Sequence, residues 1–176
     1  MTRLLAGILF VAAVATFGDY VWFEIGIRHQ VTAGALHGAV LLGSVGLVLG
    51  WLAGRMLAGL LSGIAAGVGG AAGYYMIASS SQRSETFPAM IAAWAAVWLV
   101  LAACDGRILR RPPRAWSEVL IRGGVAAVVG GLAFYAVLGV IWGDRAPGER
   151  NYLLQFGAWM VAWAPGILAI AAPKGK

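Results

Sequence analysis

The chain has 176 residues, of which 61% are hydrophobic and 11% charged, and its formal net charge is +6. Because soluble domains carry about 25% charged residues, this composition excludes an ordinary water-soluble globule and indicates a membrane protein. The single cysteine, Cys104, excludes an internal disulfide and a metal cluster built from cysteines.

Long runs without charge predict an all-α polytopic membrane protein with six transmembrane helices, arranged as three hairpins in one domain over residues 1–176. Crossing a hydrocarbon core of about 30 Å takes about 20 apolar residues. Five runs are that long, and the first also qualifies if it continues through Asp19 to Phe23. The predicted helices are Leu4–Phe23, Val31–Ala53, Met56–Ala78, Phe87–Cys104, Glu118–Trp142 and Asn151–Ala172.

The first predicted helix is similar to a secretory signal peptide, because Arg3 precedes an apolar run with a possible cleavage site at Ala13-Val14-Ala15. The apolar run resumes at Tyr20–Phe23, so we interpret the segment as an uncleaved helix. Its last residues, Trp22 and Phe23, suit the aromatic belt found at membrane interfaces.

The stretch Gly46–Tyr75 is apolar and rich in glycine, with one charge at Arg55. In water each glycine weakens a helix by about 1 kcal/mol relative to alanine, whereas small residues four apart in a bilayer form a groove for a second helix. We therefore expect two helices joined at Arg55 and packed backbone to backbone, or else self-association into a homo-oligomer. The alternative is glycine and alanine filler facing lipid. The spaced glycines are Gly46, Gly50, Gly54, Gly59, Gly63, Gly67, Gly69 and Gly73.

The loop Asp105–Ser117 separates the fourth and fifth predicted helices, and its Pro112-Pro113 pair cannot continue a helix. Asp105, beside Arg107, is expected to end the fourth helix at the membrane interface. Arginines of this loop could touch anionic lipid heads, each worth about 1 kcal/mol, although setting the topology needs no ligand.

Basic residues are distributed unequally between the two sides of the predicted bundle, nine against four. A basic excess marks the cytoplasmic side, so both termini are expected in the cytoplasm, with the protein in a bacterial inner membrane. The positive charge is therefore not a nucleic-acid signal. The nine are Arg3, Arg55, Arg107, Arg110, Arg111, Arg114, Arg122, Lys174 and Lys176, and the four are Arg28, Arg83, Arg145 and Arg150.

An internal repeat is visible in the apolar segments. Gly63–Tyr74 matches Gly124–Tyr135 at eight of twelve positions, and Ala93-Trp94 with Trp98 matches Ala158-Trp159 with Trp163. Three two-helix units would then insert in the same orientation around a pseudo-threefold centre, where a cavity could lie. Chance matches in glycine- and alanine-rich sequence are the alternative.

Polar residues within membrane spans are costly and are therefore candidates for function. Those of this chain fall in the half of the bundle expected to face outward, where they could line a lipid pocket with walls for acyl chains or a ring system. The alternative is structural: Asp19 pairs with Arg28, and the tyrosines belong to the interfacial belt. The candidate lipid-pocket residues are Asp19, His37, Gly70, Tyr74, Tyr75, Tyr135 and Gln155.

Support for catalysis is weaker. His37 with Asp19 could act as a general base with its orienting partner, so a membrane enzyme is one alternative. No serine or cysteine stands in a nucleophile motif, and the two histidines form no His-x-x-x-His pair for zinc. We expect a non-catalytic protein without metal or cofactor. A small transporter or channel is the other alternative.

The layout resembles the Insig family of sterol-sensing regulators and their bacterial relatives. The similarity is carried by six spans with little outside the bilayer, the small-residue helix Gly38–Gly54, Asp105-Gly106-Arg107 closing the fourth helix, and Tyr152-Leu153 with Trp159 opening the sixth. The resemblance implies a diacyl lipid or a sterol-like molecule bound among the helices, and no enzymatic activity. A second resemblance, to the three-hairpin HdeD-type family, rests on the repeat and on Trp116, Gly123 and Gly130, and it implies an acid-stress membrane protein.

Overall fold

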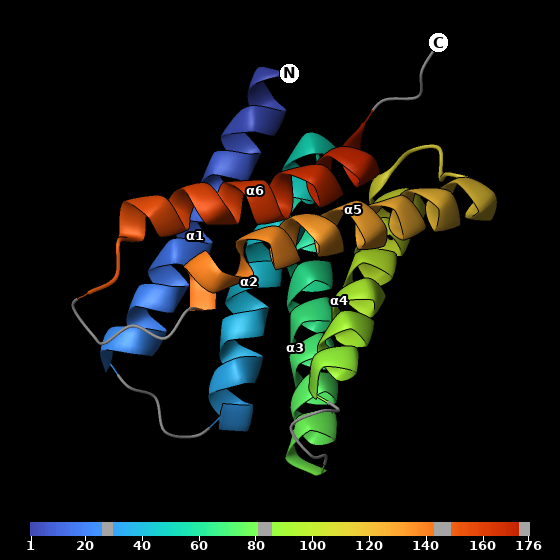
Figure 1. Ribbon diagram of the computed structural model, residues 1–176. Helices are drawn as coiled ribbons and strands as arrows, with labels where there is room; N and C mark the ends of the chain where they lie inside the picture. Colours follow the sequence, from blue (N-terminus) through green and yellow to red (C-terminus); the bar gives the residue numbers. More distant parts are fainter. Residues whose placement is uncertain (26–29, 81–85, 143–148, 173–176) are drawn as a thin grey trace.

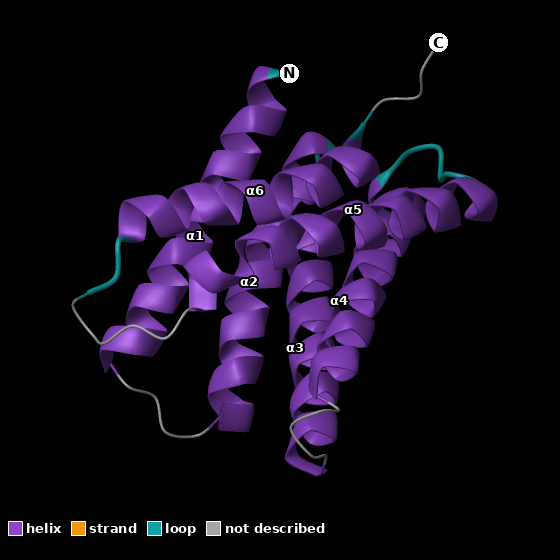
Figure 2. Cartoon of the chain, viewed as in Figure 1, coloured by secondary structure: helices purple, strands orange, loops and turns teal. Residues whose placement is uncertain are grey.

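The computed structural model describes residues 1–25, 30–80, 86–142 and 149–172, and these are helical apart from short connections (Figure 2). Every predicted helix is present, with ends within two residues of the prediction. The elements are α1 (Thr2–Ile25), α2 (Gln30–Leu52), α3 (Met56–Ser80), α4 (Thr86–Ala103), η2 (Cys104–Leu109), α5 (Trp116–Trp142) and α6 (Tyr152–Ala171). The all-α fold with six long apolar helices is therefore confirmed.

One boundary differs from the prediction. The chain does not leave the helix at Asp105, because α4 continues into the π-helical η2, which ends at Leu109. The backbone amide of Arg110 donates to the carbonyl oxygen of Asp105 at 3.1 Å, five residues back. Asp105 and Gly106 are buried, so this wide turn lies inside the bundle.

The six helices form a ring in chain order around a common centre. Each helix packs against the next one along the chain, and α6 returns to pack against α1. Figure 1 shows α1 to α4 side by side, with α5 and α6 running across them. Every helix therefore has one side toward the centre and one side toward the surroundings.

The α2–α3 contact is built from glycines whose backbones touch. A methyl group placed on Gly46, Gly59, Gly63 or Gly67 would overlap a backbone carbonyl oxygen of the facing helix. The prediction of backbone-to-backbone packing is confirmed, and it is met inside one chain. Homo-oligomerisation stays a prediction that this packing does not require.

The turn between α2 and α3 is closed by Gly54, whose φ of 72° lies in the left-handed region that favours glycine. The Arg55 amide donates to the carbonyl of Gly50 at 2.6 Å, and the Gly54 amide donates to Trp51 at 3.2 Å. These two bonds make a Schellman motif, which satisfies the last carbonyls of α2 and reverses the chain within four residues.

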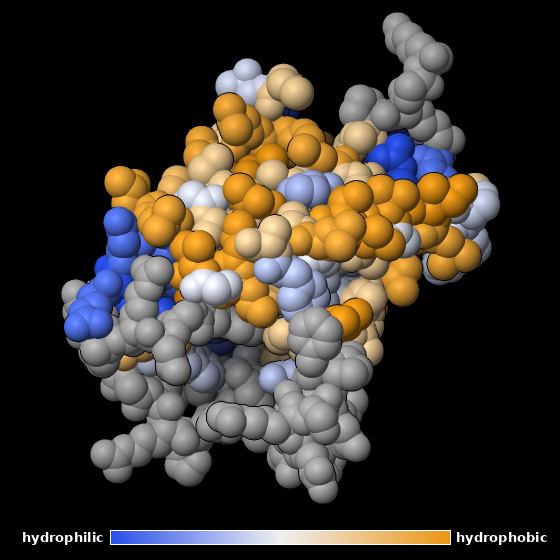
Figure 3. Space-filling view, in the orientation of Figure 1, coloured by the Kyte–Doolittle hydropathy of each residue, from blue (hydrophilic) through white to orange (hydrophobic). Residues whose placement is uncertain are grey.

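The outer surface carries an apolar band between polar ends. Leu120, Val128, Leu132 and Leu153 are each at least 60% exposed, and Figure 3 shows hydrophobic residues covering α5 and α6 with hydrophilic residues at their ends. All six helices are long and apolar enough to cross a membrane. The chain is an integral multi-pass membrane protein.

The predicted grouping of basic residues at one end of the bundle is visible in their contacts. The Arg3 guanidinium lies 6.0 Å from the ring centre of Trp51, beside the α2–α3 turn. Arg55, in that turn, donates to the carbonyl of Ile108. We call this the basic end, and the end at which α1 ends and α2 begins the opposite end.

Candidate functional site

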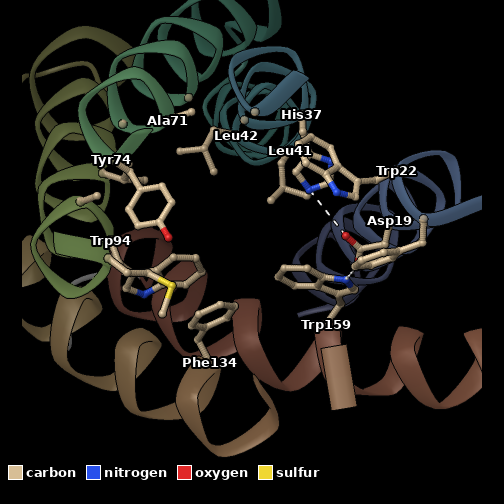
Figure 4. A pocket seen from close by; sticks show the side chains of 18 residues that line it. Asp19, Trp22, His37, Leu41, Leu42, Ala71, Tyr74, Trp94, Phe134 and Trp159 are labelled. Carbon is tan, nitrogen blue, oxygen red and sulfur yellow. Dashed lines mark hydrogen bonds and ion pairs between the residues drawn. The ribbon is translucent and has the colours of Figure 1, made fainter. Parts of the chain in front are cut away.

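A cavity of about 450 Å³ lies at the centre of the ring, toward the opposite end. All six helices contribute to its wall, which is mainly apolar with a polar corner on one side and the hydroxyl of Tyr74 on the other, and Figure 4 shows the labelled side chains facing a shared space. The lining residues are Asp19, Trp22, Phe23, Gly34, His37, Gly38, Leu41, Leu42, Gly67, Gly70, Ala71, Tyr74, Met90, Ala93, Trp94, Val97, Phe134 and Trp159.

The polar corner of the cavity is centred on Asp19, whose side chain is buried. Its Oδ2 accepts hydrogen bonds from Gln155 Nε2 and from Trp159 Nε1, both at 2.6 Å. Its Oδ1 lies 3.6 Å from His37 Nε2, the contact drawn as a dashed line in Figure 4. A carboxyl group at this depth is costly unless donors reach it, and here α6 supplies two, while His37 of α2 lies close by.

The start of α6 places both donors. Asn151 caps the helix, because its side-chain oxygen accepts from the Leu154 amide at 3.0 Å. Gln155 and Trp159 follow at a spacing of four residues, so they stand one above the other on the same face. Gln155 Nε2 also donates to the carbonyl of Ile141 at 3.3 Å, which connects this face to the end of α5.

An aromatic cluster forms the wall across from α2 and α3. Trp94 stacks on Phe134 with ring centres 4.5 Å apart and lies 5.0 Å from Trp163. Trp163 in turn lies 5.6 Å from Trp98 and 5.8 Å from Trp159. The two tryptophan pairs matched by the internal repeat therefore pack against each other between α4 and α6, although the repeat alone did not predict this contact.

The sequence-predicted site residues meet only in part. Asp19, His37, Gly70 and Tyr74 line the cavity. Gln155 lies behind Asp19 and holds it in place.

Two other residues predicted for the lipid pocket, Tyr135 and Tyr75, are not among the described residues of the cavity wall. Tyr135 is partly buried with its ring 5.7 Å from that of Phe134, and it is not among the lining residues. The side chain of Tyr75, and the alternative pairing of Asp19 with Arg28, lie outside the described residues.

Sequence reasoning missed most of the cavity wall. Trp22 and Phe23 were assigned to an interfacial belt, yet both line the cavity, and Trp22 meets His37 edge to face at 5.6 Å. Trp94, Phe134 and Trp159 were not predicted as lining residues. The repeated tryptophan spacing was the one available signal.

Comparison of the chain with family models, with curated proteins and with solved structures found no match. Among the described residues, no group of three His, Cys, Asp or Glu side chains could hold a metal ion. The shape and chemistry of the cavity are therefore the basis for a functional assignment.

The basic end is closed by a second buried carboxylate, Asp105, which is fully inaccessible to solvent. Arg110 Nη2 lies 2.9 Å from its Oδ1, and Arg114 Nη1 donates to its Oδ2 at 2.7 Å. Burial lowers the pKa of the Arg114 guanidinium, and the charge of Asp105 opposes that shift. Arg107, two residues after Asp105, does not pair with it; the Arg107 guanidinium carbon instead lies 4.9 Å from the ring centre of Trp116.

Two arginines also cap α6. Arg114 Nη1 donates to the Ile170 carbonyl at 3.0 Å, and Arg122 Nη1 donates to the Ala172 carbonyl at 2.6 Å. These bonds satisfy carbonyls that a helix leaves unpaired at its C-terminus. Part of the arginine loop thus serves the protein itself, while lipid-head contact stays a prediction for its exposed members, Arg107 and Arg111.

Proposed function

We propose that the protein binds one membrane lipid in its central cavity and is not an enzyme, in the manner that its resemblance to the Insig family implies. The observation that carries this proposal is the cavity itself, with mainly apolar walls from all six helices and a buried polar corner at Asp19 and His37. Such a space matches an amphiphile, whose polar head takes the corner and whose apolar part contacts the aromatic wall.

The cavity volume limits what can fit inside. At roughly 30 Å³ per heavy atom, the share of one water in the liquid, the space of about 450 Å³ holds about 15 heavy atoms. This is close to one acyl chain or most of a fused ring system. A sterol-like molecule would extend beyond the cavity, and a diacyl lipid would keep its second chain elsewhere.

The filled half of the bundle favours binding over conduction. Val45, Leu101, Leu109 and Ile167 lie between the cavity and the basic end, and each is at most 2% exposed. A water-filled pore would need polar groups along that path, and the buried charge at its far side, Asp105, is held by arginines. A channel would therefore require the core to open.

The lining residues also give little support to a reaction. His37 and Asp19 could serve as a base with its partner, but the described residues of the cavity wall include no serine, threonine, cysteine or lysine. A hydrolase would then have to activate water without a nucleophilic side chain. The Asp19–His37 pair is better suited to hydrogen bonding a hydroxyl or ester group.

Mass spectrometry of the protein purified in mild detergent tests the proposal. We expect one lipid species bound at close to one molecule per chain, as intact complex and after organic extraction. Ala71→Phe places a large side chain in the cavity and should abolish binding of this lipid. Gly139→Phe is the matched control, because a Cβ at Gly139 would have no described atom within 4 Å.

Two outcomes would refute lipid binding. One is a folded wild-type protein that carries no lipid beyond the mixed lipids of its micelle. The other is a folded Ala71→Phe protein that keeps the same lipid at the same occupancy. Substrate flux in proteoliposomes without bound lipid would instead support a transporter.

A further inference from the structure

A second hollow, of about 590 Å³, lies between α3 and α4 on the outside of the ring. Leu61, Val100 and Ile108 line it, and these side chains are 57%, 45% and 46% exposed. The hollow is therefore a groove open to the surroundings, and its wall is apolar apart from Ser62 and Cys104. In a membrane the neighbours of such a surface are lipid acyl chains.

The groove and the central cavity share two residues, Gly70 of α3 and Val97 of α4. A Cβ atom built on Gly70 would lie 2.6 Å from Val97 Cγ2, so the Val97 side chain rests directly on the α3 backbone. The wall between cavity and groove is thus one valine side chain thick at this point.

Two other contacts between neighbouring helices, α2–α3 and α4–α5, are closed more firmly. The α2–α3 contact joins two backbones through glycines such as Gly63. At the α4–α5 contact, a Cβ on Gly123 would lie 3.1 Å from Ala102 Cβ and 3.3 Å from the backbone of Leu99. Beside Gly70, in contrast, no described atom lies within 4 Å of where a Cβ on Gly73 would be.

We propose that the α3–α4 contact at Gly70 and Val97 is a lateral opening through which a lipid acyl chain passes between the bilayer and the central cavity. This rests on the proposed function and adds the route by which the lipid enters. A two-chain lipid places one chain in the cavity and the other in the groove, which together supply the volume that the cavity alone lacks.

The depth of the opening fits a chain from the bilayer. Val97 follows Ala89, the first residue of its span, by eight residues, which is about 12 Å along the helix. That position lies within the hydrocarbon region, where acyl chains are present and water is scarce. If the Val97 side chain changes rotamer and α3 separates slightly from α4, the central cavity and the groove become continuous.

A reversible crosslink tests the opening directly. Gly70→Cys with Val97→Cys, in a Cys104→Ser background, places two thiols across it, and loss of the valine methyl groups leaves room for the disulfide. The probe is a diacylglycerol with a photoreactive diazirine on one acyl chain, added to phosphatidylcholine nanodiscs. Mass spectrometry of the digested protein then measures, as a function of time, the yield of probe crosslinked to peptides that line the cavity, such as the peptide that contains Trp159.

We expect the oxidised protein to take up the probe into the cavity more slowly by about tenfold or more, with the rate restored by dithiothreitol. Ala102→Cys with Gly123→Cys in the same background is the control, since it ties α4 to α5 and should leave uptake unchanged. Val97→Ala, which needs no crosslink, should speed uptake about threefold.

The outcomes separate this proposal from the function it rests on. Cavity crosslinks that form equally fast in oxidised and reduced protein, or a Val97→Ala rate equal to that of the wild type, overturn the opening and leave lipid binding intact. A reduced protein whose crosslinks never reach the cavity overturns both. If the α4–α5 crosslink slows uptake as much as the α3–α4 crosslink does, the opening is also overturned.

Discussion

The Trp159 indole donates to Asp19 Oδ2 at 2.6 Å, and this bond joins the first helix of the chain to the last. It brings together residues 140 positions apart and closes the ring around the cavity. The same oxygen accepts from Gln155, so one buried carboxylate both completes the fold and presents its other oxygen to His37.

Replacing Asp19 should therefore reveal a structural role that is separable from charge. Asp19→Ala leaves the Gln155 and Trp159 donors buried without their acceptor, and we expect a loss of about 2 kcal/mol in the free energy of unfolding. Asp19→Asn keeps one oxygen that accepts from both donors and should lose less. Unfolding by sodium dodecyl sulfate titration in mixed micelles measures both. Equal losses for the two variants would contradict this role.

The glycines of α3 should differ in what they tolerate. Gly63→Ala puts a methyl group against the Leu42 carbonyl, and we expect a cost of about 1–3 kcal/mol from overpacking. Gly69→Ala, six residues along, meets nothing within 4 Å and should change stability by less than about 0.5 kcal/mol. Thermal unfolding in detergent compares them. A neutral Gly63→Ala would show that the two backbones can separate without cost.

Sequence alone was sufficient for the helices and for their closest contact. The bilayer fixes the length of a span, so hydropathy located every helix, and glycine spacing located the α2–α3 contact because only glycine permits that approach. Asp19 and His37 were also found, since a polar group in an apolar helix stands out.

Most residues of the cavity wall could not be predicted from the sequence. The spans are apolar on every side, so the pattern does not say which face points inward, and Trp94 or Phe134 gave no sign of lining a cavity. The π-helical η2 was missed because Asp105 looks like a helix end in sequence. Its arginine partners, Arg110 and Arg114, follow it by five and nine residues, and only the folded turn brings them to it.

Asp105 should be the most sensitive residue at the basic end. Asp105→Ala removes the partner of two arginines at a buried site, and we expect a loss of about 3–5 kcal/mol in the free energy of unfolding. Arg111→Ala is the matched control, because Arg111 belongs to the same loop and is exposed. Denaturant titration measures the free energy of unfolding of both variants. Similar stabilities would mean that the ion pairs around Asp105 add little to the closed end.

The basic end should face the cytoplasm, since the excess of Lys and Arg sets the orientation of short-loop membrane proteins. Two exposed positions report on this in a Cys104→Ser background: Ala115 near the arginine cluster and Glu149 at the start of the α6 region. In spheroplasts of an expressing bacterium, a membrane-impermeant maleimide should label Glu149→Cys directly and Ala115→Cys only after lysis. Labelling of Ala115→Cys before lysis would reverse the topology. The cavity, which lies toward the opposite end, would then open to the inner leaflet, and the lipid presented to Asp19 and His37 would come from the cytoplasmic side.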